Sequence, residues 1–446
     1  MIRLSGAAFP RWAATLGATA LLVVAAPAQT ANATVLTCGQ TVTTSVVLSA
    51  DLLNCPGDGL VVGAGGITVD LNGRTIDGVG LGAGIRNNGF AGVTLTNSAA
   101  APGRVQQFDY GVRLNAGTAG NIVEKLTIQN NEFSGIELNS AHTNNQVRNN
   151  LIDRQSHRGI TIIGGSGSNV ITGNTLTANQ GQGAYVQNSA GNRIEGNRIT
   201  GSGGNALALE GSGTNSLLVN TLGTSGDAAV TLRLGSNNNL VQGNTSDRSA
   251  DAGLIVADST GNRVLSNTLR NAGDSGIVLQ AAHHTTVTGN DVRGNTGGIE
   301  LSSANNNLIQ SNNASNTTGI GIQLGLSLNN ELRRNDANNN GAQGIYVVGD
   351  APAATGNRLI ENTTSVNQSD GISVSKAAHT LRGNIARDNK GWGVSADPGN
   401  IDGGGNQAVL TDDGTYTLTL ADHQGTGQLA VNTTDQTLVQ RRALPF

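Results

Sequence analysis

Aromatic and charged residues are scarce in this chain of 446 residues. Phe, Trp and Tyr make up 2% of it, and Asp, Glu, Lys and Arg make up 13%. A globular domain of this length normally fills a deep core with large aromatic side chains, so their shortage argues against such a core. The formal charge is −4 and no basic block is present, which argues against nucleic acid as a partner.

What the chain has instead is a short phrase that recurs through residues 145–384. The phrase is Asn, any residue, an aliphatic residue, any two residues and Asn, as in Asn192 to Asn197. Steps between the closing asparagines are 22 to 24 residues, apart from one of 27. A fixed period of this size indicates a solenoid. The closing asparagines are Asn150, Asn174, Asn197, Asn220, Asn244, Asn267, Asn290, Asn312, Asn335, Asn362 and Asn384.

A second motif, Gly-Ile-x-Leu, accompanies the phrase, for example at Gly135 to Leu138 and Gly298 to Leu301. Aliphatic residues two apart point to the same face of a strand, while Gly and Asn favour tight bends. Leucine-rich repeats have a similar period but carry several leucines at set spacings, and disordered chains lack aliphatic residues in register. The predicted fold class is therefore all-β, a parallel β-helix solenoid of about 12–13 coils with strands about 4.8 Å apart.

The first residues predict a secretory signal peptide. Arg3 and Arg11 give a basic start, an apolar run covers 12–26, and small residues follow. We predict cleavage after Ala33, with cleavage after Ala28 as the alternative. The apolar run is short and Ala-rich for a membrane span, so we expect an exported protein, secreted or periplasmic, without membrane insertion after signal removal.

The two cysteines, Cys38 and Cys55, stand early in the expected mature chain. In an oxidising compartment, two thiols this close most simply form one disulfide. Such a bond would fix the segment that covers the first coil, where an open sheet edge would invite aggregation.

The repeat fades beyond Asp397, and residues 415–420 and 428–431 alternate as strands do. This pattern predicts a C-terminal β cap, and no hydrophobic tail or sorting signal follows it. The predicted organisation is a signal peptide at 1–33, an N-terminal cap and first strands at 34–83, β-helix repeats at 84–402 and the C-terminal cap at 403–446.

Several segments of the chain resemble secreted bacterial right-handed β-helix proteins. They are Cys38 to Leu52, Cys55 to Val62, Ile67 to Gly78 and Asp402 to Asn406. The repeats between them are similar to the NosD-type and carbohydrate-active β-helix repeat. This resemblance implies a right-handed winding, which the general handedness of parallel crossovers also favours. Members of this family include polysaccharide lyases, epimerases, hydrolases and adhesins, so the resemblance leaves the function open.

A constant period lets side chains be assigned to columns along the solenoid. The opening asparagines and their substitutes form one column: Asn145, Asn169, Asn192, Asn215, Asn239, Asn262, Thr285, Asn307, Asn330, Asn357 and His379. We expect this column and that of the closing asparagines to be structural, because stacked amides bond from coil to coil. The outward residue of the second motif gives a third column: Arg113, Glu137, Thr161, Tyr185, Ala208, Thr231, Ile255, Val278, Glu300, Gln323, Tyr346, Ser373 and Ser395.

Three aspartates, Asp227, Asp251 and Asp274, follow one another at intervals of 24 and 23 residues. Their carboxylates would lie roughly 5 to 10 Å apart on adjacent coils. Three interpretations remain open: solvated turn aspartates, a site for a cation such as Ca²⁺, and the paired carboxylates that glycoside hydrolysis requires.

A second cluster of candidate residues lies closer to the N-terminus. Asp109 and His157 fall in the same column as the three aspartates, and Arg158 follows His157. Arg113 lies one coil from Glu137, as a catalytic or sugar-contacting pair or as an ordinary cross-strand ion pair.

These observations leave three hypotheses about function. The first is an exported, monomeric β-helix that binds or processes an extracellular polysaccharide, as a lyase, hydrolase or epimerase if it is an enzyme. The second is a structural or adhesive rod without chemistry. The third is a NosD-like periplasmic accessory for copper loading, against which stand the single Met, Met1, and the expected pairing of both cysteines.

Overall fold

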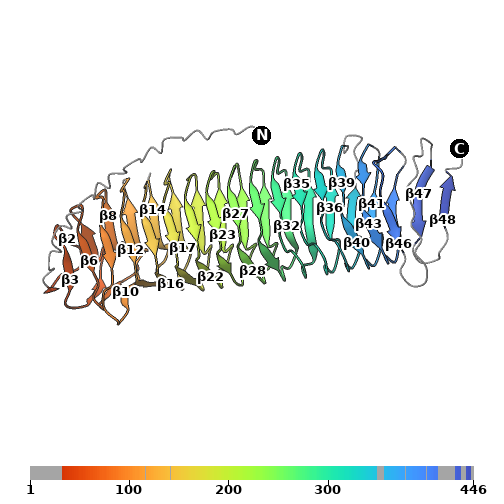
Figure 1. Ribbon diagram of the computed structural model, residues 1–446. Helices are drawn as coiled ribbons and strands as arrows, with labels where there is room; N and C mark the ends of the chain where they lie inside the picture. The colour runs from red at the N-terminus through yellow and green to blue at the C-terminus, as the bar shows by residue number, and fades with distance from the viewer. Residues whose placement is uncertain are drawn as a thin grey trace, which may run out of the picture.

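The computed structural model describes residues 33–115, 117–140, 142–348, 356–376, 378–397, 399–409, 427–432 and 438–442. These residues form a parallel β-solenoid of about 16 turns, and they contain no helix and therefore none that could span a membrane. The turns follow one another along a single axis from the N-terminal to the C-terminal end (Figure 1). The predicted fold class is confirmed, with more turns than the 12–13 predicted, because the first turns lack the asparagine phrase. The predicted signal peptide lies outside the described residues, except for Ala33.

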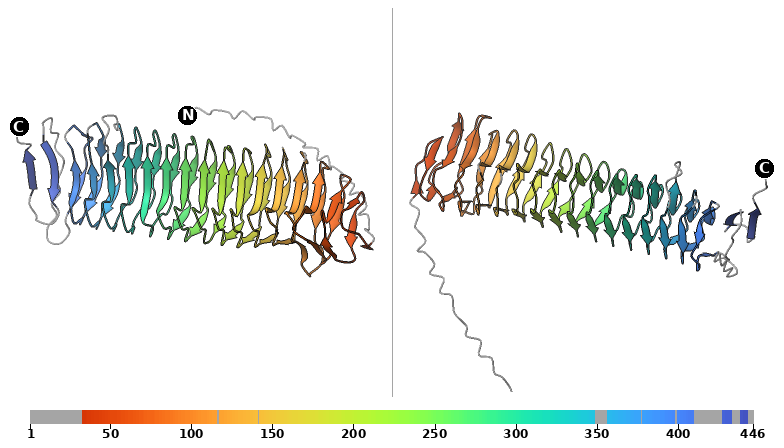
Figure 2. Two further views of the ribbon diagram at one scale, coloured as in Figure 1. Left: turned by 180° about the vertical axis from the view of Figure 1, so that it is seen from behind. Right: turned by 90° about the horizontal axis from the view of Figure 1, so that it is seen from above.

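Each turn contributes one strand to each of up to three sheets, and the views from behind and from above show the sheets running the length of the rod (Figure 2). Sheet A begins with the pair β1–β3 and ends at β45. Its strands are β1 (Ala33–Thr34), β3 (Val46–Leu48), β6 (Thr68–Asp70), β9 (Thr94–Thr96), β12 (Ile122–Glu124), β15 (Gln146–Arg148), β18 (Val170–Thr172), β21 (Arg193–Glu195), β24 (Ser216–Leu218), β27 (Leu240–Gln242), β30 (Arg263–Leu265), β33 (Thr286–Thr288), β35 (Leu308–Gln310), β37 (Glu331–Arg333), β39 (Arg358–Ile360), β42 (Thr380–Arg382) and β45 (Ile401–Asp402).

Sheet B carries the second motif and is parallel up to β44, after which two antiparallel strands complete it. Its strands are β2 (Gln40–Val42), β5 (Leu60–Val62), β8 (Ala83–Asn88), β11 (Tyr110–Asn115), β14 (Ser134–Asn139), β17 (Arg158–Ile163), β20 (Ala184–Gln187), β23 (Leu207–Glu210), β26 (Val230–Arg233), β29 (Leu254–Ala257), β32 (Ser275–Gln280), β34 (Gly297–Ser302), β36 (Ile322–Gly325), β38 (Ile345–Val348), β41 (Ile372–Val374), β44 (Trp392–Ala396), β47 (Gly427–Asn432) and β48 (Leu438–Arg442).

Sheet C is interrupted between β31 and β40, where isolated bridges at Asp291, Asn313 and Asp336 carry the stack onward. Its strands are β4 (Leu52–Cys55), β7 (Thr75–Gly78), β10 (Gly103–Gln106), β13 (Leu126–Gln129), β16 (Leu151–Asp153), β19 (Thr175–Thr177), β22 (Arg198–Thr200), β25 (Thr221–Leu222), β28 (Thr245–Asp247), β31 (Thr268–Arg270), β40 (Thr363–Ser365), β43 (Ile385–Arg387) and β46 (Gln407–Val409).

The core is a narrow stack of aliphatic side chains from all three sheets. Val112, Ile136 and Ile160 occupy successive turns of sheet B and are fully buried. Burial of each such side chain contributes about 2 kcal/mol. Because turns lie about 4.8 Å apart, a branched aliphatic side chain fills the space to its neighbour without an aromatic ring. This explains how the fold manages with so few aromatic residues.

The two predicted asparagine columns are confirmed as hydrogen-bonded ladders. Asn145 Nδ2 and its backbone N–H both donate to Asn169 Oδ1 of the next turn, each at 3.0 Å. Asn145 Nδ2 also donates to the carbonyl of Thr118 in the previous turn, at 3.1 Å. In the second ladder, Asn150 makes the same contacts with Asn174 and with the Val123 carbonyl. Each buried amide therefore joins three consecutive turns.

A third, interrupted ladder was not predicted from the sequence. Asn131 Nδ2 donates to Gln155 Oε1 at 2.9 Å, and Asn367 Nδ2 donates to Asn389 Oδ1 at 2.9 Å. Between them, shorter side chains occupy five of the turns, at Ser202, Ser225, Ser249, Ala272 and Thr317. These shorter side chains interrupt the pattern of asparagines, so the column is not apparent from the sequence.

The predicted disulfide and C-terminal cap are both present. Cys38 and Cys55 are bonded, with their Cα atoms 5.3 Å apart. The predicted strand at 428–431 falls within β47, which pairs antiparallel with β44 and with β48. This hairpin covers the last parallel edge of sheet B. The predicted strand at 415–420 lies outside the described residues.

Before most ladder asparagines the backbone takes positive φ. Gly196, Val219 and Gly243 occupy this position on three successive turns, with φ of 61°, 45° and 67°. A β-branched residue is strained at such angles, whereas glycine is not. Val219 is also 55% exposed, so its side chain contributes little to the core.

We therefore expect Val219→Gly to stabilise the fold by about 1 kcal/mol, because it removes the left-handed strain of a β-branched residue. Thermal unfolding followed by circular dichroism measures this change. Val79→Gly is the matched control, since Val79 is 52% exposed and has no positive φ. A lower melting temperature for Val219→Gly than for the native protein would contradict this account.

His379 occupies the first ladder in place of asparagine and interrupts it. It is fully buried, and neither ring nitrogen has a partner in the described part of the chain. Burial lowers the pKa of His379 below its ordinary value of 6.5. The unfolded chain therefore binds a proton more readily than the folded chain, and stability declines as the pH falls below that ordinary value.

His379→Asn should restore the ladder, since Oδ1 at this position can accept the backbone N–H of Asn357. We expect a gain of about 1 kcal/mol at pH 8, where the histidine is neutral, and a larger gain at pH 5. Melting temperatures of both proteins at the two pH values measure it. An equal gain at both pH values would show that the histidine is not the acid-sensitive group.

Candidate functional site

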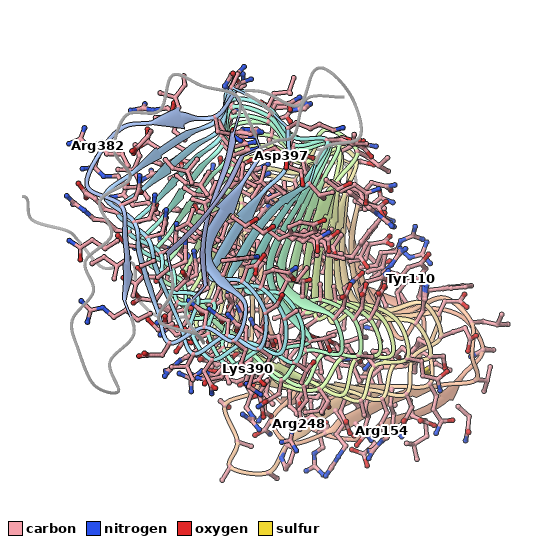
Figure 3. The ribbon with its side chains drawn as sticks, turned by 90° about the vertical axis from the view of Figure 1, so that its right-hand side faces the viewer. Tyr110, Arg154, Arg248, Arg382, Lys390 and Asp397 are labelled. Atoms are coloured by element: carbon pink, nitrogen blue, oxygen red, sulfur yellow. A yellow bond between two sulfur atoms is a disulfide. The ribbon has the colours of Figure 1, made fainter. Side chains whose placement is uncertain are left out.

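Sheet B presents its outward side chains in the predicted column. Arg113 pairs with Glu137, Glu137 with Thr161 and Thr161 with Tyr185 in the strand register. Viewed along the axis, Tyr110 of this sheet lies on the opposite side of the outline from Arg382 of sheet A, and Arg154 and Arg248 lie along the lower edge (Figure 3).

A continuous group of polar side chains covers this sheet from β11 to β26. We call it the polar face, and it consists of Arg113, Glu137, Arg158, Thr161, Tyr185, Glu210 and Arg233. Thr161, Tyr185 and Glu137 are only 1%, 4% and 5% exposed although they point away from the core. Their neighbours in the polar face cover them, so these outward side chains are held in fixed positions.

The first part of the polar face is an ion pair beside two aromatic rings. Arg113 Nε lies 2.9 Å from Glu137 Oε1, so the sequence-predicted pair is present. The Arg113 guanidinium lies 4.2 Å from the centroid of the Tyr110 ring, whose centroid is 5.6 Å from that of Phe133. Partial burial and the Glu137 carboxylate raise the pKa of Tyr110. Phe133 is 47% exposed, so a large part of its side chain is open to solvent.

The second part is a chain of contacts across four turns. Arg158 places its guanidinium 3.9 Å from the centroid of the Tyr185 ring. The Tyr185 hydroxyl donates to Glu210 Oε2 at 2.6 Å, and Arg233 Nε donates to Glu210 Oε1 at 2.7 Å. These contacts involve one side chain from each of β17, β20, β23 and β26.

These contacts set the protonation states of Tyr185 and Glu210. Burial and the bond to Glu210 raise the pKa of Tyr185 to about 12. Burial alone would raise the pKa of Glu210, but the bonds from Tyr185 and Arg233 outweigh it and lower that pKa. At neutral pH Tyr185 is therefore a neutral phenol and Glu210 a carboxylate, so neither is suited to move a proton.

The sequence-predicted second cluster lies on three neighbouring turns. The Phe133 backbone N–H donates to the Asp109 carbonyl at 2.8 Å, and the Gly181 N–H donates to the His157 carbonyl at 2.6 Å. These bonds confirm that Asp109, Phe133, His157 and Gly181 share one column along the edge of sheet B. Desolvation and the neighbouring Arg158 charge lower the pKa of His157.

The three aspartates continue this column further along the rod. Asp227 and Asp274 are exposed, and Asp251 between them is half-buried. Burial raises the pKa of Asp251, and the negative charges of Asp227 and Asp274 raise it further. Asp251 therefore takes up a proton more readily than an ordinary aspartate does.

The described residues contain no group of three or more His, Cys, Asp or Glu side chains arranged to hold a metal ion. The described structure therefore gives no support to the predicted calcium site at Asp227, Asp251 and Asp274.

The distance between two carboxyl groups decides whether they can act together in hydrolysing a glycosidic bond. Glu137 and Glu210 lie on turns three steps apart, roughly 14 Å along the axis at about 4.8 Å per turn. Glycoside hydrolysis uses carboxyl groups about 5 to 10 Å apart, so these two do not form such a pair. Asp227 and Asp251 lie on adjacent turns, close enough for Asp227 to raise the pKa of Asp251 by its charge and by a hydrogen bond.

The chain matches a family model described as "Right handed beta helix region" over residues 163–313 and 296–409. A second model, "Periplasmic copper-binding protein (NosD)", matches residues 56–231. No curated protein matches the chain in sequence.

Two solved structures are similar to this chain at a level that concerns the fold alone. One is the A-module of mannuronan C-5 epimerase AlgE4 from Azotobacter vinelandii, with 14% identity, a TM-score of 0.44 and coverage of 81% of this chain and 91% of that chain. Another is DFA-IIIase from Arthrobacter chlorophenolicus A6 without its lid, with 13% identity, a TM-score of 0.45 and coverage of 60% and 81%. The first family model spans more than half of the chain, which therefore belongs to the right-handed β-helix family.

Proposed function

We propose that this protein binds an extracellular polysaccharide along the outward face of sheet B. The observation that carries the proposal is the aromatic pair of Tyr110 and Phe133 beside the polar face. The whole chain has only 5 Phe and 4 Tyr, yet two of these rings meet here. Phe133 keeps 47% of its surface exposed, so a ligand can reach this ring.

The geometry of the face suits a linear polymer. A sugar ring has apolar C–H faces that pack on an aromatic ring and hydroxyl groups that bond to charged and polar side chains. Turns repeat about every 4.8 Å, so the polar face offers a straight row of such groups along the rod. Fixed side chains lower the entropic cost of binding.

Within the same proposal, the aspartates Asp227, Asp251 and Asp274 process the bound polymer. Asp251 carries a raised pKa next to the exposed carboxylate of Asp227. Unequal carboxyl groups of this kind are what acid–base catalysis on a glycosidic bond uses. Asp251 would then donate the proton and Asp227 would act as the base or nucleophile.

Export is part of the proposal. It is supported by the Cys38–Cys55 disulfide, since such bonds persist in oxidising compartments. The predicted signal peptide and the match to a family described as periplasmic point the same way.

Phe133→Ala should weaken polysaccharide binding about tenfold, because a lost ring contact is worth about 1.4 kcal/mol. Glycan arrays identify the ligand, and titration calorimetry then measures both proteins. Leu326→Ala is the control, since Leu326 is 49% exposed and lies outside the polar face. If no extracellular polysaccharide binds the native protein, the proposal fails and the rod without chemistry is the better account.

The match to the NosD model favours a second candidate, a copper-loading accessory. Copper sites use soft or imidazole ligands, and both described cysteines are in the disulfide. We therefore expect the protein, after incubation with copper and desalting, to retain less than one copper per chain by elemental analysis. A stoichiometric ion would support the accessory role instead. The same measurement with calcium, on native protein and Asp251→Asn, tests the predicted calcium site.

A further inference from the structure

We propose that Arg158 binds an anionic group of the polysaccharide, so that the ligand is an acidic polymer carrying carboxylate or sulfate groups. This inference rests on the proposed function and names its substrate class. It comes from the contacts of one guanidinium that differs from the others on the same sheet.

Arg158 has no carboxylate partner in the described part of the chain, whereas the other arginines of sheet B near it do. Arg86 pairs with Asp58, Arg113 with Glu137 and Arg233 with Glu210. Arg158 Nε instead donates to Gln182 Oε1 at 3.0 Å, a neutral acceptor. Its two Nη groups make no hydrogen bond to a described residue, and they are free to bind an anion.

The Arg158 guanidinium is held in place by the aromatic ring on which it packs. It stacks 3.9 Å from the centroid of the Tyr185 ring, and the Tyr185 hydroxyl is fixed by Glu210 at 2.6 Å. Glu210 is itself fixed by Arg233. Because Tyr185 is only 4% exposed, the ring cannot turn away, and the cation keeps its position before any ligand arrives. Such preorganisation lowers the cost of binding.

Arg158 shares the field of the Glu210 carboxylate with Arg233, and the three arginines of the polar face outnumber its two glutamates. The nearest carboxylates on the face, Glu137 and Glu210, are each engaged by another arginine. Its sequence neighbour His157 is neutral at neutral pH, since its pKa is lowered. In the edge column, Asp109 lies two turns before His157 and Asp227 three turns beyond it, roughly 10 and 14 Å along the axis. Positive potential therefore persists at this one position of the polar face.

An anionic group fits this arrangement better than a sugar hydroxyl does. The two Nη groups of a guanidinium donate to both oxygens of a carboxylate or to two oxygens of a sulfate, and such charge-assisted bonds are about twice as strong as neutral ones. The aromatic pair lies next to this position, because Phe133 precedes His157 by one turn in the edge column. One sugar ring on Phe133 would place a neighbouring acidic group near Arg158.

The experiment compares polymers that differ in charge. Polygalacturonate is compared with its methyl ester, and dextran sulfate with dextran, by titration calorimetry on the native protein, Arg158→Gln, Arg158→Lys and Arg198→Gln. Arg198 is an exposed arginine of sheet C without an ion pair to any described residue, so its variant controls for the loss of one positive charge elsewhere. Thermal unfolding confirms that each variant is folded.

We expect the native protein to bind at least one charged polymer tenfold or more tightly than its neutral counterpart. Arg158→Gln should remove that preference, Arg158→Lys should keep part of it and Arg198→Gln should keep all of it. Tighter binding of polygalacturonate identifies a carboxylate ligand, and tighter binding of dextran sulfate a sulfate ligand. Equal binding of charged and neutral polymers, or a preference that survives in Arg158→Gln, would overturn this inference and leave the proposed function standing. If neither these four polymers nor any glycan-array ligand binds, both fail.

Discussion

A buried asparagine amide that bonds to the turn before it and the turn after it is the interaction on which this structure depends. Asn150 illustrates it: its Nδ2 donates to Val123 in the previous turn and to Asn174 in the next. A buried amide without partners would cost several kcal/mol, so a turn that slipped by one residue would be strongly disfavoured. The ladders therefore fix the register of the turns that carry them.

A fixed register also determines what the outside of the rod can do. Residues about two dozen apart in sequence stand next to each other, which is why Arg113 meets Glu137 and Tyr185 reaches Glu210. Most ion pairs on sheet B close between adjacent turns. Where a turn lacks the matching carboxylate, as around Arg158, the proposed function assigns the charge to a ligand. In that proposal, structure and binding use the same side chains in the same columns.

Much of the fold could be predicted from the sequence, because the repeat period determines which residues lie next to each other on adjacent turns. The asparagine ladders and the outward column of sheet B followed from spacing alone, and the cysteine pairing followed from the closeness of the two residues together with the expected export. The Tyr185–Glu210 bond could not be predicted, since Glu210 belongs to a second outward position and its side chain turns toward the previous strand. The first turns were missed because other residues, such as Val69 and Leu95, build them without the asparagine phrase. Function is harder still, because ladders and cores are shared across the family while the site depends on a few side chains.

A crystal structure of the protein with a uronic acid oligosaccharide tests the central claim most directly. The account predicts a sugar chain running along sheet B, with one ring packed on Phe133 and a carboxylate within hydrogen-bond distance of the Arg158 Nη groups. A sugar bound to sheet A or sheet C, or one that leaves Arg158 without an anionic partner, would contradict it.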